Sequence, residues 1–536
     1  MNTSEDDITT SPHLHVSMEE DQNPGDVGEG SNTDKIKNDQ ALLIEENTHV
    51  DEGKWKKFFN VAKVESVEMF RIGWPLAVTF VSLMGMQFVD MIFLGNLGKK
   101  EYLAGAALST AFGYCVLYPV FGTTAAQETL VSQAKGLGNV FVMRVVFVRS
   151  IIISSILCIP ITLLFSFSGE IFTLLVKKEE ESAGLVVQYA RSYTLLLIPG
   201  IWPFVMFRVL LSFMTSQNIV YPPMIVGVAS NLVNILLNVL LVVGVGYQGL
   251  GFDGAAIATC ISRWITILLL GGYMYYNKGD ITIKQVKEIC REALKWRGLL
   301  EYIKLAIPGG LMLAFEVWGF EITSILSSLM GSVALAAHAA LINTTALTFM
   351  IPLSISTSTG VRIGQRLGSN DPSGAKQTCW MAVLFATVFM SINACSLVVF
   401  RFYIARLFTD DEQVIQVVGK NAYIAALFQL FDGVQVTLGG ALRGIGKQSI
   451  GAAMTFVSYY VVGIPIGCLC GFYFKWGLVG LWFGLLMGLS TIAIILLCYV
   501  VFLVSWEREA VSATNRITMQ GEQEQTEEVA QEIELN

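Results

Sequence analysis

Residues 302–328 read YIKLAIPGGLMLAFEVWGFEITSILSS, a run of mostly apolar side chains with only three charged ones. An α-helix rises about 1.5 Å per residue, so about 20 apolar residues cross a hydrocarbon layer about 30 Å thick. The stretch is long enough for that crossing. Its charged residues are Lys304 near one end and Glu316 and Glu321 inside. It therefore predicts a membrane-spanning helix that carries two carboxyl groups into the bilayer.

Eleven further stretches of this kind occupy most of the 536-residue chain. With 53% hydrophobic and 15% charged residues and a mean hydropathy of +0.58, the chain has more apolar side chains than one aqueous core can hide, which argues against a soluble enzyme. The strands of a β-barrel would be shorter and would alternate in polarity. We predict an all-α membrane protein. Its twelve transmembrane helices are residues 69–93, 102–126, 143–166, 187–211, 221–246, 253–276, 302–328, 333–357, 377–400, 414–438, 450–474 and 477–504.

The two halves of the chain repeat each other. Pro75 and Pro308 occupy equivalent points in the first and seventh spans, and residues 251–254 correspond to residues 477–480. The offset between the copies drifts only from about 233 to about 226 residues, as a duplication followed by small loop changes would leave it. Because each half holds an even number of crossings, both copies have the same topology.

This repeat predicts two pseudo-symmetric six-helix lobes around a central cavity, which is the geometry of an alternating-access transporter. We assign the lobes to residues 66–276 and 301–505, with a connector at 277–300. Polar, acidic tails remain at residues 1–60 and 506–536, and we expect both to be disordered.

Lysine and arginine in the short loops predict the orientation. An even number of crossings places both tails and the connector on one side, and the loops on that side carry most of the positive charge, so this side is cytosolic. The membrane itself, plasma membrane or vacuolar or other organellar membrane, is left open. The basic residues behind this orientation are Lys278, Lys284, Lys287, Arg291, Lys295, Arg297, Arg362, Arg366, Lys376, Arg443 and Lys447.

Several functional classes find no support in the sequence. The nine cysteines form no CxxC pair and lie mostly in apolar stretches, so we expect no metal site and no cofactor. The chain has no nucleotide-binding GxxxxGK[ST] loop and no basic stripe interleaved with aromatic residues, which argues against ATP use and nucleic-acid binding. We expect a monomer in the lipid bilayer that is not an enzyme.

Four acidic residues lie inside the predicted spans: Asp90, Glu316, Glu321 and Asp432. An ionised side chain deep in a bilayer costs at least about 2.5–3.5 kcal/mol, so such residues persist where they face a cavity or a partner. Basic residues in the spans lie mostly near helix ends, from which they can reach the interface. The acidic interior favours a cationic small-molecule substrate.

Glu316 and Glu321 cannot both point squarely at the cavity, because five residues turn an α-helix by about 140°. Glu316 lies near the middle of its span, and the ring of nearby Trp318 could form the cavity or its edge. We therefore favour Glu316 as the functional acid. Glu321 is either a second cation-binding acid or a carboxyl held in a structural hydrogen bond, with Arg263 or a hydroxyl of the following helix.

Other polar residues inside the spans could line the cavity, and each also has a purely structural interpretation. Asn231 and Asn234 share a helix face and either line the cavity or hold neighbouring helices together. Gln87 lies one turn before the aspartate of the first span and could hydrogen-bond to it. His338 is either a packing residue or a proton relay, and Asn343 could face Glu316. The full set of candidates is Gln87, Asn231, Asn234, Trp318, His338 and Asn343.

Arginines at the cytosolic ends of the spans predict a gate. Arg362, Arg366 and Arg443 could close the cytosolic side by pairing with acids such as Glu128. The alternative is that these arginines only orient the chain in the membrane.

Eight segments, in order and at characteristic spacing, point to one family. They are Pro75, Phe93-Leu94-Gly95-Asn96-Leu97-Gly98, residues 128–136 (ETLVSQAKG), Gln217-Asn218-Ile219-Val220, Asn231 through Asn238, residues 315–321 (FEVWGFE), residues 361–368 (VRIGQRLG) and residues 440–448 (GALRGIGKQ). Over almost all of residues 66–505 the chain resembles a eukaryotic-type member of the multidrug and toxic compound extrusion (MATE) family.

This resemblance implies secondary antiport that exports organic cations or other small molecules in exchange for protons, with sodium as the alternative coupling ion. It implies that Glu316 is the carboxylate of the seventh helix that binds cation and proton, and that Asp432 matches the acidic position of the tenth helix. Asp90 is similar to an aspartate of prokaryotic members that many eukaryotic members lack. A lipid-linked sugar flippase shares the general architecture and is the less favoured alternative, because its cavity should be basic.

The expected mechanism is competition at one carboxylate. A carboxyl group in apolar surroundings favours its protonated form over its ionised form, so Glu316 and Asp432 are expected to exchange protons. One carboxylate cannot hold a proton and a cation together, and this competition is reciprocal by linkage. Proton entry would thereby drive export of a cation.

Overall fold

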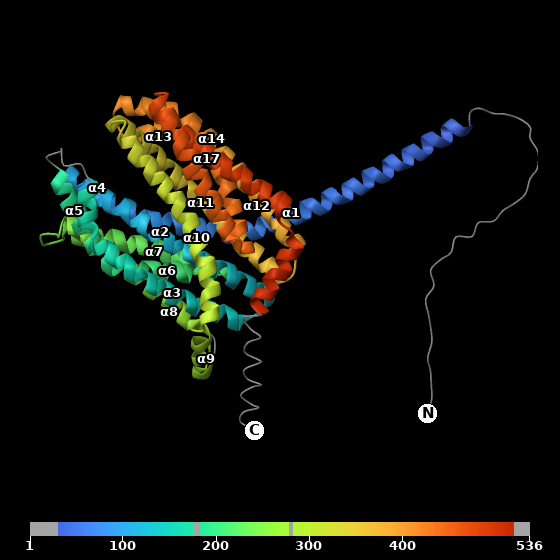
Figure 1. Ribbon diagram of the computed structural model, residues 1–536, viewed down its shortest axis with the longest axis horizontal. Helices are drawn as coiled ribbons and strands as arrows, with labels where there is room; N and C mark the ends of the chain where they lie inside the picture. The colour runs from blue at the N-terminus through green and yellow to red at the C-terminus, as the bar shows by residue number, and fades with distance from the viewer. Residues whose placement is uncertain (1–30, 176–182, 278–281, 519–536) are drawn as a thin grey trace, which may run out of the picture. The chain divides into compact units, whose positions relative to one another are not determined.

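The computed structural model describes the backbone of residues 31–175, 183–277 and 282–518, and the side chains of residues 63–174, 184–277 and 282–518 (Figure 1). Residues 64–536 form one compact unit, and the residues before Val64 form another. Every regular element in the described ranges is a helix. Twelve helices in these ranges are long and apolar enough to cross a membrane, which confirms the predicted number of spans.

The N-terminal lobe contains the first six spans. Its fourth span consists of two α-helices joined by a turn of 3-10 helix, and its fifth ends in a short π-helix. The helices of this lobe are α1 (Ser31–Gly95), α2 (Lys100–Leu137), α3 (Val140–Ser166), α4 (Ser168–Leu175), α5 (Ala183–Leu197), η1 (Ile198–Gly200), α6 (Ile201–Ser216), α7 (Tyr221–Asn238), η2 (Val239–Val243) and α8 (Phe252–Tyr276).

The C-terminal lobe contains the other six spans, and α9 (Ile283–Ala293) lies in the connector before it. Its fifth span alternates between α- and π-helix. The helices of this lobe are α10 (Trp296–Ser328), α11 (Ser332–Gly368), α12 (Pro372–Val399), α13 (Arg401–Arg406), α14 (Glu412–Ile445), α15 (Gln448–Phe456), η3 (Val457–Gly463), α16 (Ile464–Cys468), η4 (Leu469–Tyr473), α17 (Leu478–Cys498) and η5 (Tyr499–Leu503).

Capping residues explain the short turns between these long helices. Gly138 ends α2 in the left-handed region at φ 79°, where glycine carries no steric penalty, and Gly446 ends α14 in the same way at φ 86°. Asn139 and Asp371 then cap the N-termini of α3 and α12, because their side chains accept hydrogen bonds from Val142 N and Gly374 N.

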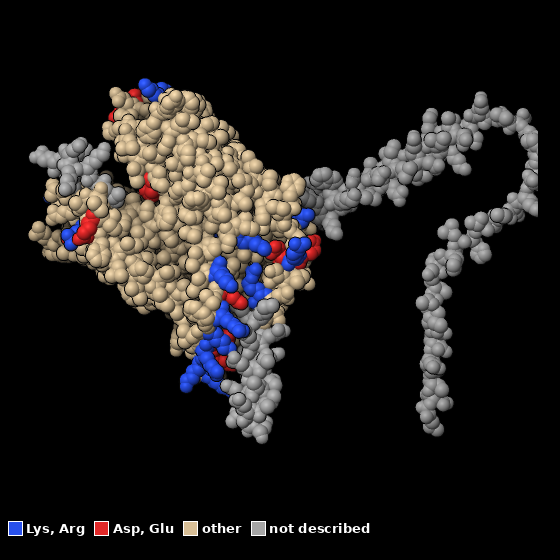
Figure 2. Space-filling view, in the orientation of Figure 1, with Lys and Arg blue, Asp and Glu red and all other residues tan. Residues whose placement is uncertain are grey.

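The two lobes are in close contact at the helix ends that include residue 65, the connector and residue 503, a side that we call the connector face. There Gly136 of α2 lies against Gln365 and Ser369 of α11, and Gly364 of α11 lies against Ser132 of α2. A Cβ atom at either glycine would clash, so these glycines permit the close approach. Toward the opposite face the helices of the two lobes spread apart, and the surface is indented there (Figures 1 and 2).

The prediction that residues 506–536 are disordered is wrong for residues 506–518, which form a helix. Trp506, Ala510, Ala513 and Ile517 are buried and recur at helical spacing. The first three pack into an apolar core with helices α11, α12, α14 and α17, and Ile517 packs against α2 and α3. This apolar stripe is the physical reason for the helix, because it can be buried on both lobes at once. Residues 519–536 lie outside the described part of the chain.

The predicted disordered segment 1–60 also differs from the structure, because helix α1 begins at Ser31. Between Ser31 and the first span the sequence contains no proline and one glycine, Gly53. Nothing therefore stops a helix from propagating out of the apolar span. Residues 1–30 lie outside the described residues.

Candidate transport and coupling site

Glu316 and Asp432 lie in one buried polar group inside the C-terminal lobe. We call this group, which also contains Gln435 and Tyr459, the C-lobe carboxyl cluster. Glu316 comes from α10 and Asp432 and Gln435 come from α14, and the two acids are 8% and 4% exposed. The π-helical segment η3 supplies Tyr459, whose ring would collide with any Cβ atom at Gly319. The glycine one turn after Glu316 thus lets a tyrosine ring approach the acid.

The polar atoms of the C-lobe carboxyl cluster are incompletely paired. Oδ1 of Asp432, both amide atoms of Gln435 and the hydroxyl of Tyr459 are buried without a hydrogen-bond partner among the described residues. Glu316 interacts electrostatically with Asp432, and both acids do so with Tyr459. The amide of Gln435 also interacts with Glu316, but its atoms lie outside hydrogen-bond geometry. A buried polar group left unpaired costs about 1–3 kcal/mol, so the arrangement is suited to receive a proton, water or a cation.

Glu321 and Trp318 turn away from this cluster toward the N-terminal lobe. The indole Nε1 of Trp318 donates to the carbonyl oxygen of Cys115 in α2 at 2.9 Å, which joins the two lobes. Glu321 is half-buried and interacts electrostatically with Tyr114 and Cys115 of the same helix. The expected structural partner Arg263 is instead stacked over the ring of Phe204 at 4.3 Å.

Asp90 lies in a second buried polar group, the N-lobe aspartate cluster, formed with Tyr193, Asn238 and Thr259. Its Oδ1 accepts from Asn238 Nδ2 at 3.0 Å, and its Oδ2 accepts from the Tyr193 hydroxyl at 3.1 Å and from the Thr259 hydroxyl. These donors come from α5, α7 and α8. Asp90 therefore has both carboxylate oxygens paired within its own lobe, unlike Asp432, whose Oδ1 is unpaired among the described residues.

The remaining polar candidates of the N-terminal lobe have structural partners. Gln87 accepts from the Tyr114 hydroxyl instead of bonding to the aspartate of its own helix. Asn231 donates from Nδ2 to the carbonyl oxygen of Ser82 at 2.7 Å, which holds α7 against α1, and Asn234 donates to Thr259 Oγ1 at 3.3 Å. A cavity of about 30 Å³, enough for about one water molecule, adjoins Gln87 and Thr259.

The two polar candidates of α11 lie apart from the C-lobe carboxyl cluster. The Nε2 atom of His338 is 3.0 Å from the hydroxyl of Ser324, and its ring meets that of Trp482 edge-on at 5.9 Å, so this histidine has the environment of a packing residue. Asn343 is exposed, and its side chain makes no hydrogen bond with the described residues. The expected approach of Asn343 to Glu316 is therefore absent.

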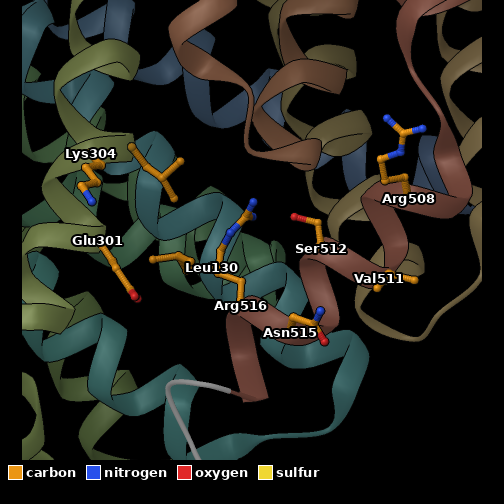
Figure 3. Close-up of a pocket in the computed structure, with 9 residues that line it drawn as sticks. Leu130, Glu301, Lys304, Arg508, Val511, Ser512, Asn515 and Arg516 are labelled. Carbon is orange, nitrogen blue, oxygen red and sulfur yellow. The ribbon is translucent and has the colours of Figure 1, made fainter.

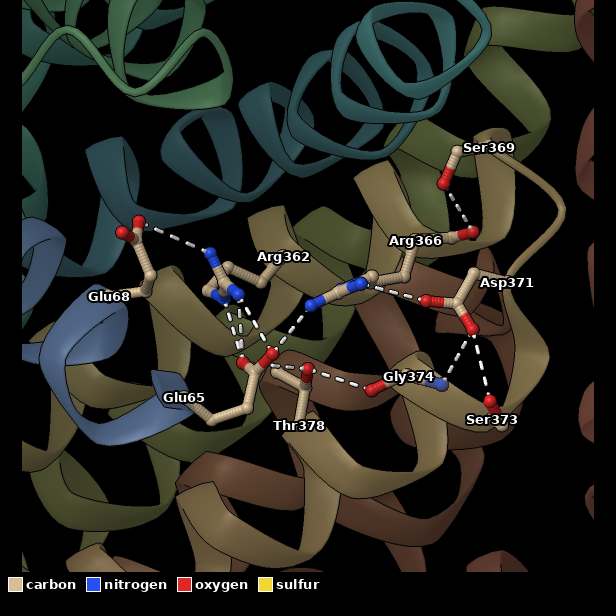
Figure 4. A network of polar contacts seen from close by, with 9 residues as sticks. All are labelled: Glu65, Glu68, Arg362, Arg366, Ser369, Asp371, Ser373, Gly374 and Thr378. Atoms are coloured by element: carbon tan, nitrogen blue, oxygen red, sulfur yellow. Dashed lines mark hydrogen bonds and ion pairs between the residues drawn. The ribbon is translucent and has the colours of Figure 1, made fainter. Parts of the chain in front are cut away.

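Arg362 and Arg366 do not pair with Glu128; both bind Glu65 of α1 in a network that we call the connector-face gate (Figure 4). Arg362 donates from Nε at 3.0 Å and from Nη2 at 2.9 Å, and Arg366 donates from Nη2 at 2.7 Å. Glu65 is 2% exposed. Because Glu65 belongs to the N-terminal lobe and both arginines to the C-terminal lobe, the gate joins the lobes.

Two further charges extend the connector-face gate on either side. Glu68 lies 3.6 Å from Arg362, and Asp371 binds Arg366 at 2.8 Å (Figure 4). Partial burial works to raise the pKa of Asp371, but hydrogen bonds from Gly374 and Ser373 and the charge of Arg366 outweigh it and hold the pKa below its ordinary value.

A second interlobe pair lies deeper in the same face. Glu128 of α2 approaches Arg443 of α14 at 3.9 Å, and Nη2 of Arg443 also donates to the hydroxyl of Ser356 at 2.9 Å. The carboxylate of Glu128 fits against Gly360, where a Cβ atom would lie 2.5 Å from its Oε1. Gln133 Nε2 completes the contact by donating to the carbonyl oxygen of Gly444 at 2.9 Å.

One family model, MatE, matches the chain twice, over residues 75–240 and 308–469. The chain belongs to the MatE family. The two matches begin at Pro75 and Pro308, the pair from which the internal repeat was read. Like its MatE relatives, the protein is a multi-pass membrane transporter of the multidrug and toxin extrusion type and not an enzyme.

Relatives of this MatE protein come from animals, plants and bacteria. Multidrug and toxin extrusion protein 2 of Mus musculus is 30% identical over 461 residues, which are 86% of this chain and 78% of the relative. Protein DETOXIFICATION 16 of Arabidopsis thaliana is 28% identical over 85% of this chain and 91% of its own. The crystal structure of the eukaryotic MATE transporter AtDTX14 has a TM-score of 0.77 and 26% identity over 85% of this chain and 100% of its own.

Sequence reasoning on this MatE protein missed several residues of the candidate site, among them Glu65, Gln435, Tyr459, Tyr193 and Thr259. Glu65 is one of several acids in a polar segment before the first span, so its burial gave no signal. Gln435 follows Asp432 by three residues, which places them on one helix face and could have identified it. The two tyrosines carry no such signal, because they meet the acids only through contacts between distant helices.

Proposed function

We propose that this protein exports organic cations or other small molecules in exchange for protons, and that Glu316 and Asp432 are the carboxyl groups at which the exchange occurs. The observation that supports the proposal most directly is that polar atoms of the C-lobe carboxyl cluster lack hydrogen-bond partners. Two buried acids share one site in which a carboxylate oxygen, an amide and a phenol lack hydrogen-bond partners among the described residues.

In this mechanism the ionised cluster attracts a cation, and protonation removes that attraction. Two carboxylates close together in a poorly hydrated site disfavour double ionisation, so at least one proton binds when no other cation is present. A substrate cation that enters from the cytosol must displace that proton, and a proton that enters from the other side must displace the substrate. The coupling free energy is the same in both directions.

The orientation in this proposal follows the positive-inside rule. Lysine and arginine side chains gather mainly at one end of the visible surface (Figure 2). Lys295, Arg362, Arg366 and Lys447 lie at helix ends of the connector face. We take this face as cytosolic. The described conformation, with the lobes joined at the connector face and apart at the opposite one, then faces outward.

The connector-face gate and the Glu128–Arg443 pair serve as the cytosolic closure in this mechanism. Both join α1 or α2 of the N-terminal lobe to α11 or α14 of the C-terminal lobe. Opening to the cytosol requires that the partners of each ion pair separate and become hydrated. The charges therefore define a closed state that can reopen, because separated ions are well solvated whereas separated apolar surfaces are not.

The test is transport by the full chain in proteoliposomes, measured with a fluorescent organic cation. An imposed pH gradient at equal sodium on both sides should drive accumulation against the substrate gradient. Sodium is the alternative coupling ion, and accumulation driven by a sodium gradient at equal pH would select it in place of protons. If neither gradient drives transport of any cation, the antiport proposal fails.

A further inference from the structure

A cavity of about 540 Å³ lies at the connector face between the helix of residues 506–518, the first turns of α10 and the end of α2 (Figure 3). It is separate from both polar clusters and from the connector-face gate. Three apolar side chains form part of its wall, one from each element: Leu130, Leu305 and Val511. Its volume is within the range of small-molecule and lipid-headgroup sites.

Positive charges outnumber negative ones around this cavity. Lys304 of α10 lines one side, and Arg508 and Arg516 of the terminal helix line the other, with Glu301 as the one acid among the described residues that line it (Figure 3). Ser512 adds a hydroxyl that is turned toward the space between the two elements. An anion in the cavity would therefore meet bases from two separate elements.

Arg516 is placed so that its charge is poorly hydrated. Its Nη1 donates to Oε1 of Gln133 in α2 at 2.9 Å. Burial lowers the pKa of its guanidinium, and the charges of Glu509 and Glu301 oppose this effect only in part. A bound anion would relieve the desolvation of this arginine.

We propose that this cavity binds an anionic phospholipid, with the headgroup phosphate between Lys304, Arg508 and Arg516 and an acyl chain along Leu130, Leu305 and Val511. The cavity lies where spans α2 and α10 reach the end of the apolar layer, which is the depth of lipid headgroups. Basic pockets between transmembrane helices at this depth are a recurring site for anionic lipids. A water-soluble phosphate would use the basic rim but not the apolar wall.

The site has a consequence for the conformation of the lobes that goes beyond the proposed antiport. The helix of residues 506–518 packs through Ala510 and Ala513 against the C-terminal lobe and through Ile517 against α2 and α3. A lipid in the cavity contacts Leu130 of α2 as well as this helix and α10, so it adds one more contact between the lobes at the connector face. Bound lipid therefore favours the conformation that is closed at that face.

The experiment measures lipid retention by the purified full chain in detergent, with native mass spectrometry and titration of phosphatidylserine, phosphatidylcholine and soluble glycerophosphoserine. Wild-type protein should retain phosphatidylserine in preference to the other two. Lys304→Gln with Arg508→Gln should weaken that retention by about fivefold for each charge removed. The control is Lys376→Gln, an exposed base on α12 outside the cavity, which should leave retention unchanged.

Three results would overturn the assignment. The first is equal phosphatidylserine retention by the double variant and the wild type. The second is equal weakening by the Lys376→Gln control, which would indicate general surface charge. The third is binding of glycerophosphoserine as tight as that of the lipid, which would assign the cavity to a soluble phosphate. Because lipid retention needs no transport, none of these results depends on the coupling ion.

Discussion

The two lobes place buried acids in different states of pairing, although their spans repeat each other. Asp90 in the N-terminal lobe receives hydrogen bonds from three side chains. Asp432 in the C-terminal lobe has an oxygen with no partner among the described residues, and Gln435 and Tyr459 beside it are also unpaired. A paired carboxylate stabilises its surroundings, whereas an unpaired one remains free to bind. Under the proposed function, we therefore expect a structural role for Asp90 and exchange at the C-lobe carboxyl cluster.

The largest effect is expected at Glu316. Glu316→Gln replaces one of the two carboxyl groups of the C-lobe carboxyl cluster with a neutral amide. It should reduce transport driven by a pH gradient to background, because the amide cannot exchange a proton for a cation. Transport in proteoliposomes measures this, and thermal unfolding of the purified variant should resemble that of the wild type. Glu321→Gln, on the same helix but turned toward α2, is the matched control and should retain coupled transport.

Full coupled transport by Glu316→Gln would contradict the assigned role. Loss of transport in Glu321→Gln but not in Glu316→Gln would move the exchange site from the C-lobe carboxyl cluster to the surface between α10 and α2.

The next effect concerns the closure that both lobes share. Arg362→Gln leaves part of the buried charge of Glu65 uncompensated, and removal of one partner of a buried pair costs about 3–5 kcal/mol. The cost falls on the conformation closed at the connector face, so the variant should shift toward opening there. Hydrogen–deuterium exchange of residues 132–138 and 360–368, which lie against each other in this face, should rise.

The charge-neutral double variant Glu65→Gln with Arg362→Gln should recover part of the protection, because it leaves less unpaired charge. Exchange in these segments that stays at the wild-type level in Arg362→Gln would show that the pair does not hold the lobes together.

A smaller effect is expected at Asp90, and it sharpens the contrast between the lobes. Asp90→Asn weakens the hydrogen bonds that the carboxylate accepts from Tyr193, Asn238 and Thr259. A hydrogen bond to a charged group contributes about 1.5–3 kcal/mol, so we expect the free energy of unfolding to fall by about 2 kcal/mol. Coupled transport per folded molecule should persist. A variant with unchanged thermal stability and abolished coupling would make Asp90 a second exchange site and end the distinction between the lobes.

The smallest effect is expected at Asp371 and depends on pH. Its folded-state pKa is lowered, so the folded protein binds the proton less readily than the unfolded chain. The stabilisation is therefore fully present above the unfolded pKa of about 4 and is lost as pH falls through the folded pKa. Asn is as good an N-cap as Asp, so Asp371→Asn should cost up to about 1 kcal/mol near neutral pH through loss of the carboxylate charge and of the pair with Arg366.

Thermal unfolding of the wild type and of Asp371→Asn between neutral and strongly acidic pH measures this difference. The two curves should converge only at the acidic end. Curves that stay apart by the same amount at every pH would show that the carboxylate charge contributes nothing.

Much of the fold was predictable because each span is recognisable from its own continuous apolar segment. Long apolar runs gave all twelve helices, and Pro75 and Pro308 marked the repeat that the family matches reproduce. The burial of the helix of residues 506–518 was missed although its apolar residues recur at helical spacing. That pattern is short and lies among charged residues. The helix is stabilised only when its apolar side chains can be buried against both lobes.

The sequence by itself determined the spans, their number and the presence of acids inside them, because crossing a bilayer depends on the length and polarity of one continuous segment. Tertiary structure alone decided which acids are paired. Thr259 and Tyr193 reach Asp90 from distant helices, and Glu65 meets Arg362 across 297 positions of chain. No donor among the described residues meets Oδ1 of Asp432. Hydrogen bonds depend on positions within a few tenths of an ångström, and only the packing of whole helices determines these.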